Sequence, residues 1–158
     1  MSLRDAVSTD VPAIAEIWNH EIREGVSTFT TEQKELGALQ AALASGAVFL
    51  VHEEAGRVVG FGTFGPFRSG PGYAHTAEHT VYLAQEARGK GHGRALVDAL
   101  EEAAKARDFH VMVAAVGGEN VAGINFHKAL GFQEVARMPQ VGRKFDRWMD
   151  LVLLQKML

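Results

Sequence analysis

A glycine-rich stretch between an alternating segment and an amphipathic segment constrains the fold of this chain more than any other feature. From His75 to Leu83, Glu78, Thr80 and Tyr82 alternate with His79, Val81 and Leu83, a pattern typical of a β-strand with two different faces. After the glycines, apolar residues recur at helical spacing from about 93 to 106. The sequence therefore predicts a strand, a loop and a helix in direct succession.

The loop Arg88–Arg94 is predicted to bind an anion. Its three glycines alternate with basic side chains, and backbone N–H groups at a glycine-rich helix start converge on one point that attracts phosphate. A dinucleotide fingerprint fails because Arg94 stands where its last glycine belongs, and a Walker A loop fails because Gly91 follows Lys90. A flexible turn with solvated basic residues stays open as the alternative.

The remaining segments predict a mixed order of helices and strands. A first helix is expected to follow Ser8 and end near residue 24, and a second to follow a capping box of Thr30 and Gln33 and end at Gly46. Asn120 is expected to cap a further helix. Further strands are expected at 3–6, 47–52, 58–64, 111–116, 132–137 and 148–154. This order predicts an α+β, mixed α/β fold in a single domain spanning 1–158.

Composition excludes several classes of function. The 158 residues include no cysteine, so a catalytic thiol, a disulfide framework and a thiolate metal site are excluded. A net charge of -3 argues against nucleic acid as the main partner. No apolar run approaches the roughly 20 residues of a membrane helix, so a soluble, cytoplasmic protein without a membrane partner is expected.

Two motifs carry a resemblance to a known family. The pattern Arg88-x-x-Gly91-x-Gly93 resembles the acetyl-CoA diphosphate motif of the GCN5-related N-acetyltransferase (GNAT) superfamily, and Asn120 with the segment Phe126–Phe132 resembles its second cofactor segment. The resemblance implies acetyl-CoA as co-substrate. It also implies a central, mostly antiparallel twisted sheet of about six to seven strands flanked by about four helices.

Further residues narrow the resemblance to the phosphinothricin acetyltransferase branch. They are Trp18-Asn19-His20, Ser27-Thr28-Phe29, Glu78-His79-Thr80-Val81-Tyr82, and Val141-Gly142-Arg143-Lys144-Phe145 with Trp148 and Asp150. This branch implies a homodimer that transfers acetyl directly, in a ternary complex, to the α-amino group of a small amino acid analogue such as phosphinothricin, methionine sulfone or methionine sulfoximine. Acetylation of a protein N-terminus or lysine, or a non-catalytic acetyl-CoA-binding module, stay open as alternatives.

The resemblance also implies roles for single residues. Glu78 is expected to take the proton of the amine. Where many superfamily members have a tyrosine that protonates the departing thiolate, this chain has Phe126 and His127, so His127 or solvent is expected to supply that proton. The expected cofactor-binding residues are Val81, Tyr82, Leu83, Arg88, Gly89, Lys90, Gly91, His92, Gly93, Arg94, Asn120 and Phe126. The expected substrate-binding residues are Phe29, Arg68, Tyr73 and Lys144, with Arg143 and Trp148 as further candidates. No metal is expected, because His75 and His79 would lie about 13 Å apart on one strand.

Overall fold

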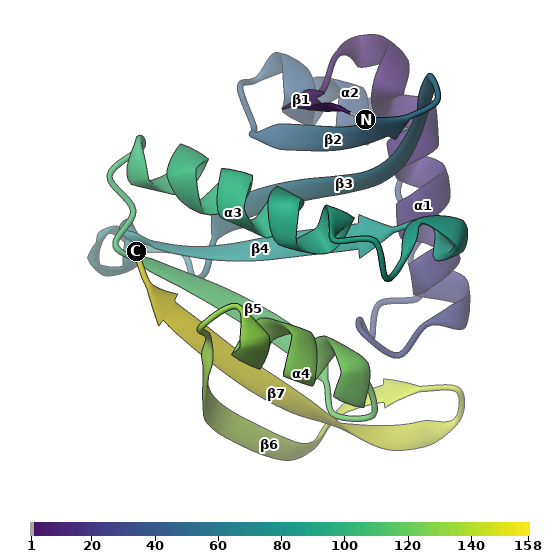
Figure 1. The fold of residues 1–158 in the computed structure, drawn as a ribbon. Helices are drawn as coiled ribbons and strands as arrows, with labels where there is room; N and C mark the ends of the chain where they lie inside the picture. Colours follow the sequence, from purple (N-terminus) through teal and green to yellow (C-terminus); the bar gives the residue numbers. More distant parts are fainter. Residues whose placement is uncertain (1) are drawn as a thin grey trace.

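A seven-stranded sheet forms the centre of the computed structural model, which describes residues 2–158 (Figure 1). The strands are β1 Ser2–Asp5, β2 Phe49–Glu54, β3 Arg57–Pro66, β4 Thr76–Leu83, β5 Val111–Gly117, β6 Gln133–Lys144 and β7 Arg147–Met157, in the order β1-β2-β3-β4-β5-β7-β6. Every neighbouring pair is antiparallel except the parallel pair β4–β5. The predicted mixed, mostly antiparallel architecture is confirmed.

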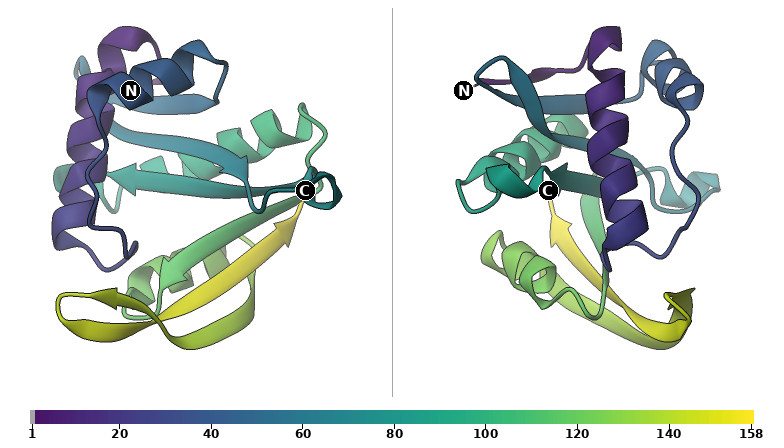
Figure 2. Two further views of the ribbon diagram at one scale, coloured as in Figure 1. Left: turned by 180° about the vertical axis from the view of Figure 1, so that it is seen from behind. Right: turned by 90° about the vertical axis from the view of Figure 1, so that its right-hand side faces the viewer.

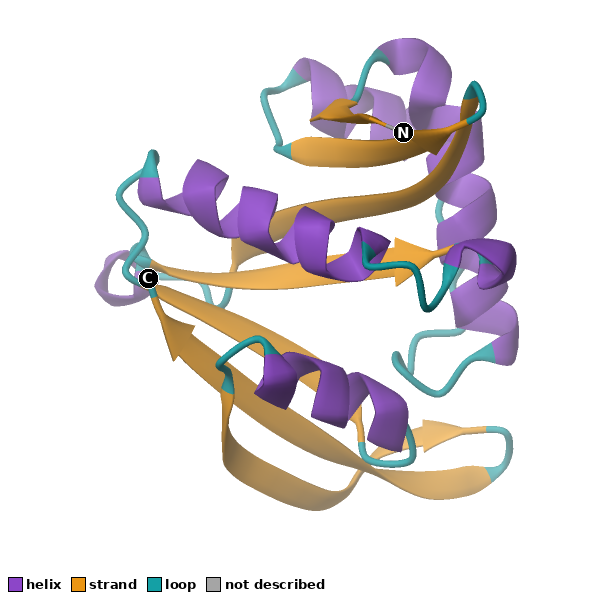
Figure 3. Ribbon diagram, in the orientation of Figure 1, coloured by secondary structure: helices purple, strands orange, loops and turns teal. Residues whose placement is uncertain are grey.

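Four α-helices cover the two faces of this sheet (Figure 3): α1 Val11–Glu24, α2 Leu36–Ala44, α3 His92–Lys105 and α4 Val121–Ala129. Helices α1 and α2 pack on one face against Val51 and Phe61, whereas α3 packs on the other against Leu50. Successive residues of β2 thus point to opposite faces, as strand geometry requires. Helix α4 lies with α3 and packs near β5 and β7. No helix within the described residues is long and apolar enough to cross a bilayer.

Two predicted elements are wrong in extent. The capping box of Thr30 and Gln33 does not form: α2 begins at Leu36, and the Thr30 hydroxyl instead accepts the N–H of Glu32 at 3.2 Å. The segment before α2 is held by the side chain of Asn19 in α1, which accepts the N–H of Lys34 and donates to the carbonyl of Lys34. Strand β6 runs on to Lys144, beyond the predicted end at 137, since its hairpin with β7 continues after a register shift between Met138 and Gly142.

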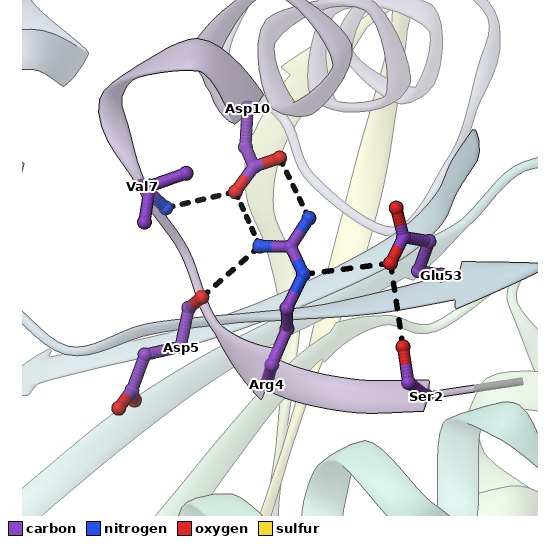
Figure 4. Close-up of polar contacts among 6 residues, drawn as sticks. All are labelled: Ser2, Arg4, Asp5, Val7, Asp10 and Glu53. Carbon is purple, nitrogen blue, oxygen red and sulfur yellow. Dashed lines mark hydrogen bonds and ion pairs between the residues drawn. The ribbon is translucent and has the colours of Figure 1, made fainter. Parts of the chain in front are cut away.

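The first strand is fastened by a small charged cluster (Figure 4). Arg4 donates from both terminal nitrogens to the carboxylate of Asp10, at 2.8 and 3.1 Å, and Asp10 also accepts the N–H of Val7 at 2.8 Å. Glu53 of β2 lies 3.5 Å from the Arg4 Nε. Asp10 is buried, so its charge depends on these partners.

Replacing Asp10 by alanine is expected to lower the free energy of unfolding by about 1–3 kcal/mol, because charge-assisted hydrogen bonds are lost. The hydrogen bond from Arg4 lowers the pKa of Asp10 below its ordinary 3.8. This stability is therefore present above that value and is lost as the pH falls through the lowered pKa. Urea titrations at pH 7 and at acid pH measure both effects. The control Glu53→Gln removes a more exposed partner and should cost less than about 1 kcal/mol.

Candidate functional site

Strands β4 and β5 separate in the middle of the sheet. They pair over three positions, Thr76 with Val111, Ala77 with Met112 and Glu78 with Val113, and beyond these their register ends. Figure 2 shows the half of the molecule with β5, α4, β6 and β7 diverging from the half with β1 to β4. From residue 79 onward, the β5-facing backbone of β4 has no strand partner in β5, so its N–H and C=O groups are open to a ligand.

A cavity of about 970 Å³ occupies this opening. Its walls come from the end of α1 and the following segment 25–29, from β4, from the glycine loop, and from β5 and α4. The alternation of β4 gives the cavity two sides. Tyr82 packs with the α1 face of the sheet, and Val81 and Leu83 pack with the α3 face. Glu78 shares the face of Tyr82, as predicted.

The glycine loop lies at the α3 side of the cavity. Gly89 and Gly91 have φ values of 76° and 85°, a region that favours glycine, and Gly91 is the N-cap of α3. Gly93 lies so close to Phe126 of α4 that a Cβ there would come within 3.0 Å of the ring. The loop thus presents backbone amides and the dipole of a 14-residue helix to the cavity.

The loop residues divide between the cavity and the rest of the protein. Arg88, Gly89, Gly91, Gly93 and Arg94 line the cavity, together with Val81, Tyr82, Leu83, Asn120 and Phe126. The Lys90 ammonium lies instead 3.6 Å from a carboxylate oxygen of Glu54, and the His92 ring is buried against His52 with 4.0 Å between ring centroids. Neither Lys90 nor His92 is among the residues that line the cavity.

Glu78 lies where the two strands separate. Its side chain is half-buried and lines the cavity, and burial raises the pKa of its carboxyl above the ordinary value. Within residues 2–158 no ion pair or hydrogen bond engages this carboxylate. A partly buried carboxylate with a raised pKa and free oxygens is suited to accept a proton from a ligand.

His79, which is buried, and His127, which is partly buried, form a pair on the opposite face of β4 from Glu78, and both line the cavity. Their Nε2 atoms lie 2.9 Å apart, and the Nδ1 of His127 lies 2.7 Å from the carbonyl oxygen of Gly123. Burial lowers the pKa of His127 and lowers that of His79 to about 3, so both rings are neutral at pH 7. Since a carbonyl can only accept, His127 carries its proton on Nδ1, and its Nε2 accepts from His79. Both nitrogens of His127 are thus occupied.

Segment 25–29 closes the α1 side of the cavity. The Lys144 ammonium is buried and donates to the carbonyls of Gly25 and Thr28 at 2.6 and 2.8 Å. Asn120 caps α4 by accepting the N–H of Gly123, as predicted, and donates to the hydroxyl of Ser27 at 2.7 Å. Phe29 lines the cavity. The structure thus commits the Lys144 amine, predicted to bind substrate, to holding this segment.

Four other predicted substrate residues lie apart from the cavity. The Arg68 guanidinium stacks over the ring of Tyr73, 5.3 Å from its centroid, in the exposed loop between β3 and β4. Arg143 stacks in the same way on Trp148, at 4.5 Å, in the β6–β7 hairpin. None of the four is among the residues that line the cavity.

Sequence reasoning missed Glu21, a buried carboxylate that lines the cavity. It belongs to the face of α1 on which Ile14, Ile17 and Trp18 point to the core, so a charged residue on an apolar stripe was the available signal. A group of three or more His, Asp or Glu side chains able to hold a metal is absent from the described residues.

The geometry fits a long ligand with a phosphate group at one end. Glycine amides, Arg88 and Arg94 suit the phosphates, and the unpaired edge of β4 suits an extended chain that makes backbone hydrogen bonds. The carboxylates lie at the α1 side, where a cationic group would be bound. Coenzyme A has a diphosphate followed by an extended chain with amide groups, so the residues present fit acetyl-CoA and leave the carboxylates for a cationic acceptor.

Comparisons with known proteins agree with this assignment. A model of the acetyltransferase (GNAT) family matches residues 13–132. An L-methionine sulfoximine/L-methionine sulfone acetyltransferase of Salmonella typhimurium is 41% identical over 98% of this chain and 93% of its own length. A phosphinothricin acetyltransferase of Sinorhizobium meliloti, solved with acetyl-CoA, is 34% identical with a TM-score of 0.92 over 99% of this chain and 88% of that chain. A ribosomal-protein-alanine N-acetyltransferase of Brucella melitensis is 37% identical with a TM-score of 0.94 over the whole of both chains.

Proposed function

The chain belongs to the GNAT family of acetyltransferases, and we propose that it acetylates the α-amino group of a small amino acid analogue by direct transfer from acetyl-CoA. The observation that carries the proposal is the position of Glu78, which has free carboxylate oxygens where β4 leaves β5 and the cavity opens. The relatives that act on methionine sulfoximine, methionine sulfone and phosphinothricin support the class of acceptor.

In the proposed reaction Glu78 prepares the acceptor. Transfer joins the acceptor nitrogen to the acetyl carbon and breaks the carbon–sulfur bond. The acceptor enters as an ammonium ion, and Glu78 takes one proton, directly or through water, so that the neutral amine can attack. Backbone N–H groups at Tyr82 and Leu83 are proposed to stabilise the oxygen that becomes negative. The second proton leaves the nitrogen as the amide forms.

One proton must reach the departing thiolate, and the other passes to water. The sequence left either His127 or solvent as the donor. Both nitrogens of His127 are engaged, by His79 and by Gly123, which favours solvent as the donor.

The walls of the acceptor end favour a small acceptor over a polypeptide. Segment 25–29 is fastened to β5 by a hydrogen bond from the Gly117 N–H to the Ser27 carbonyl, and to β6 by Lys144. The likeness to a ribosomal-protein-alanine N-acetyltransferase supports the second candidate, acetylation of a protein N-terminus. An open groove at the acceptor end of the cavity would suit a protein N-terminus better.

The test is acceptor-dependent release of CoA from acetyl-CoA across a panel of amines. It begins with phosphinothricin, methionine sulfone and methionine sulfoximine and includes alanine-ending peptides and lysine peptides. Turnover with the amino acid analogues supports the proposal, and turnover with the peptides alone would replace it by the second candidate. No release with any amine, despite acetyl-CoA binding, would favour a non-catalytic module.

A homodimer and a cytoplasmic location are part of the proposal. Apolar side chains stand exposed along β6 and at its hairpin with β7: Val135, Met138, Val141, Phe145 and Trp148. Exposed apolar groups gathered on one hairpin are typical of a subunit interface. Light scattering at assay concentration is expected to give twice the 17.1 kDa mass of the chain. A monomer at that concentration would contradict the dimer and leave the proposed reaction untouched.

A further inference from the structure

Glu21 is a buried charge with weak partners. It lies in the last turn of α1 with 9% of its surface exposed, and it lines the cavity. One carboxylate oxygen accepts the N–H of Ser27 at 3.4 Å, and the other lies 3.8 Å from a terminal nitrogen of Arg88. The first distance is long for a hydrogen bond, and the second is an ion pair without hydrogen-bond contact. A buried carboxylate whose partners are this distant has capacity for a closer cationic partner.

Glu21 lies on the α1 side of β4, the side where the acceptor amine would bind. Burial, and then the negative charges of Glu21 and Glu78, raise the pKa of Tyr82. Both carboxylates therefore lie near the same phenol, on the face of the sheet that α1 covers. The nearby Lys144 ammonium is committed to the carbonyls of Gly25 and Thr28.

Arg88, in contrast, belongs to the phosphate side. It is the first residue of the glycine loop, and its side chain is half-exposed beside Gly89 and Gly91. A diphosphate offers a guanidinium shorter, bidentate contacts than the 3.8 Å pair with Glu21. A bound diphosphate and Glu21 thus compete for Arg88.

We propose that Glu21 is an acceptor-binding residue whose carboxylate holds the ammonium group of the incoming amine and is kept neutralised by Arg88 until the diphosphate of acetyl-CoA engages that arginine. Glu21 and Glu78 then have different roles. Glu21 supplies a fixed negative charge that orients the ammonium, and Glu78 removes its proton. The two substrates are coupled through one ion pair, so the acceptor binds better after the coenzyme. This inference rests on the proposed acetyl transfer to an amine.

The variant Glu21→Gln keeps the size of the side chain and removes its charge. Loss of a charged contact to the ammonium is expected to raise the KM for the acceptor about tenfold or more, with kcat changed less than about threefold. Freed from a weak ion pair, Arg88 is expected to bind the diphosphate better, so the Kd for acetyl-CoA should fall about threefold. Calorimetry measures that Kd without turnover. Glu16→Gln, an exposed charge on the same helix, is the control and should change neither value.

Opposite shifts in the two affinities separate this role from a structural one. If Glu21 merely supported segment 25–29, Glu21→Gln would weaken both ligands together and lower the melting temperature. An unchanged acceptor KM, or weaker acetyl-CoA binding, would overturn the inference while wild-type turnover still upheld the transferase. If Glu21→Gln does not fold, Arg88→Gln serves instead. At saturating acetyl-CoA it should leave the acceptor KM equal or lower, and a raised KM would count against the inference.

Discussion

The variant Glu78→Gln is expected to lose about 100-fold to 10,000-fold in kcat at pH 7, the range associated with removal of a general base. Glutamine has a similar shape but cannot take a proton from the ammonium. Binding of acetyl-CoA should be unchanged, since Glu78 lies in β4 where it pairs with β5 and not in the glycine loop. Calorimetry with acetyl-CoA is the control. Near-normal turnover in the variant would remove Glu78 from the mechanism.

The pH dependence gives this prediction a second readout. Burial raises the pKa of Glu78 above 4.5, and the base must be ionised, so wild-type activity should rise with pH through that raised value. In Glu78→Gln this rise should vanish, and the remaining activity should grow toward alkaline pH, where the free acceptor loses its own proton. The gap between the two proteins should therefore narrow as the pH increases.

The same charge should also affect stability. A carboxyl whose pKa is raised by folding binds its proton more tightly in the folded than in the unfolded protein. Above that pKa the ionised group therefore destabilises the fold, and glutamine removes the cost. Thermal unfolding at pH 7 should show Glu78→Gln melting at or above the wild-type temperature, an outcome opposite to that of a damaged core.

The variant Gly91→Val is expected to weaken acetyl-CoA binding by about 100-fold, the loss of one or two hydrogen bonds to a charged group. Gly91 has a φ of 85° at the N-cap of α3, and a β-branched side chain disfavours that conformation by about 1–2 kcal/mol. To relieve it the loop must turn, and its amides then leave the diphosphate.

Gly37→Val is the matched control, because this glycine of α2 also has open space around its Cβ position but lacks a positive φ. Calorimetry with acetyl-CoA should find the control close to wild type. Equal weakening in both variants would indicate general damage, and full affinity in Gly91→Val would remove the loop from the binding site.

Local patterns explain what the sequence could predict. The strand that contains Glu78 was predicted correctly because its two faces pack on different helices, and the alternating residue types show this directly. The helix after Asn120 was predicted correctly because the Asn120 side chain itself caps its first turn. The helix after Thr30 was misplaced because the bonds that hold its approach come from Asn19, eleven residues before Thr30 in the sequence.

Long-range contacts explain the rest. A pattern of residues cannot show that β4 and β5 pair at three positions and then separate, nor that Lys90 and His92 turn toward β2 while their neighbours face the cavity. The turn of the β6–β7 hairpin could not be predicted from the sequence either. Phe145 and Asp146 both have positive φ, at 53° and 59°, and a phenylalanine at the first of these positions gives no turn signal.

The separation of β4 and β5 leaves a gap in the middle of the sheet that a bound acetyl-CoA would fill. Three residue pairs, segment 25–29, the His79–His127 contact and a shared apolar core join the two sides of the sheet, but beyond Glu78 no ladder of bonds links β4 to β5. A ligand lodged between them ties the two sides together, and its binding energy adds to the stability of the whole fold. The durability of this enzyme is thus linked to the supply of the compound it consumes.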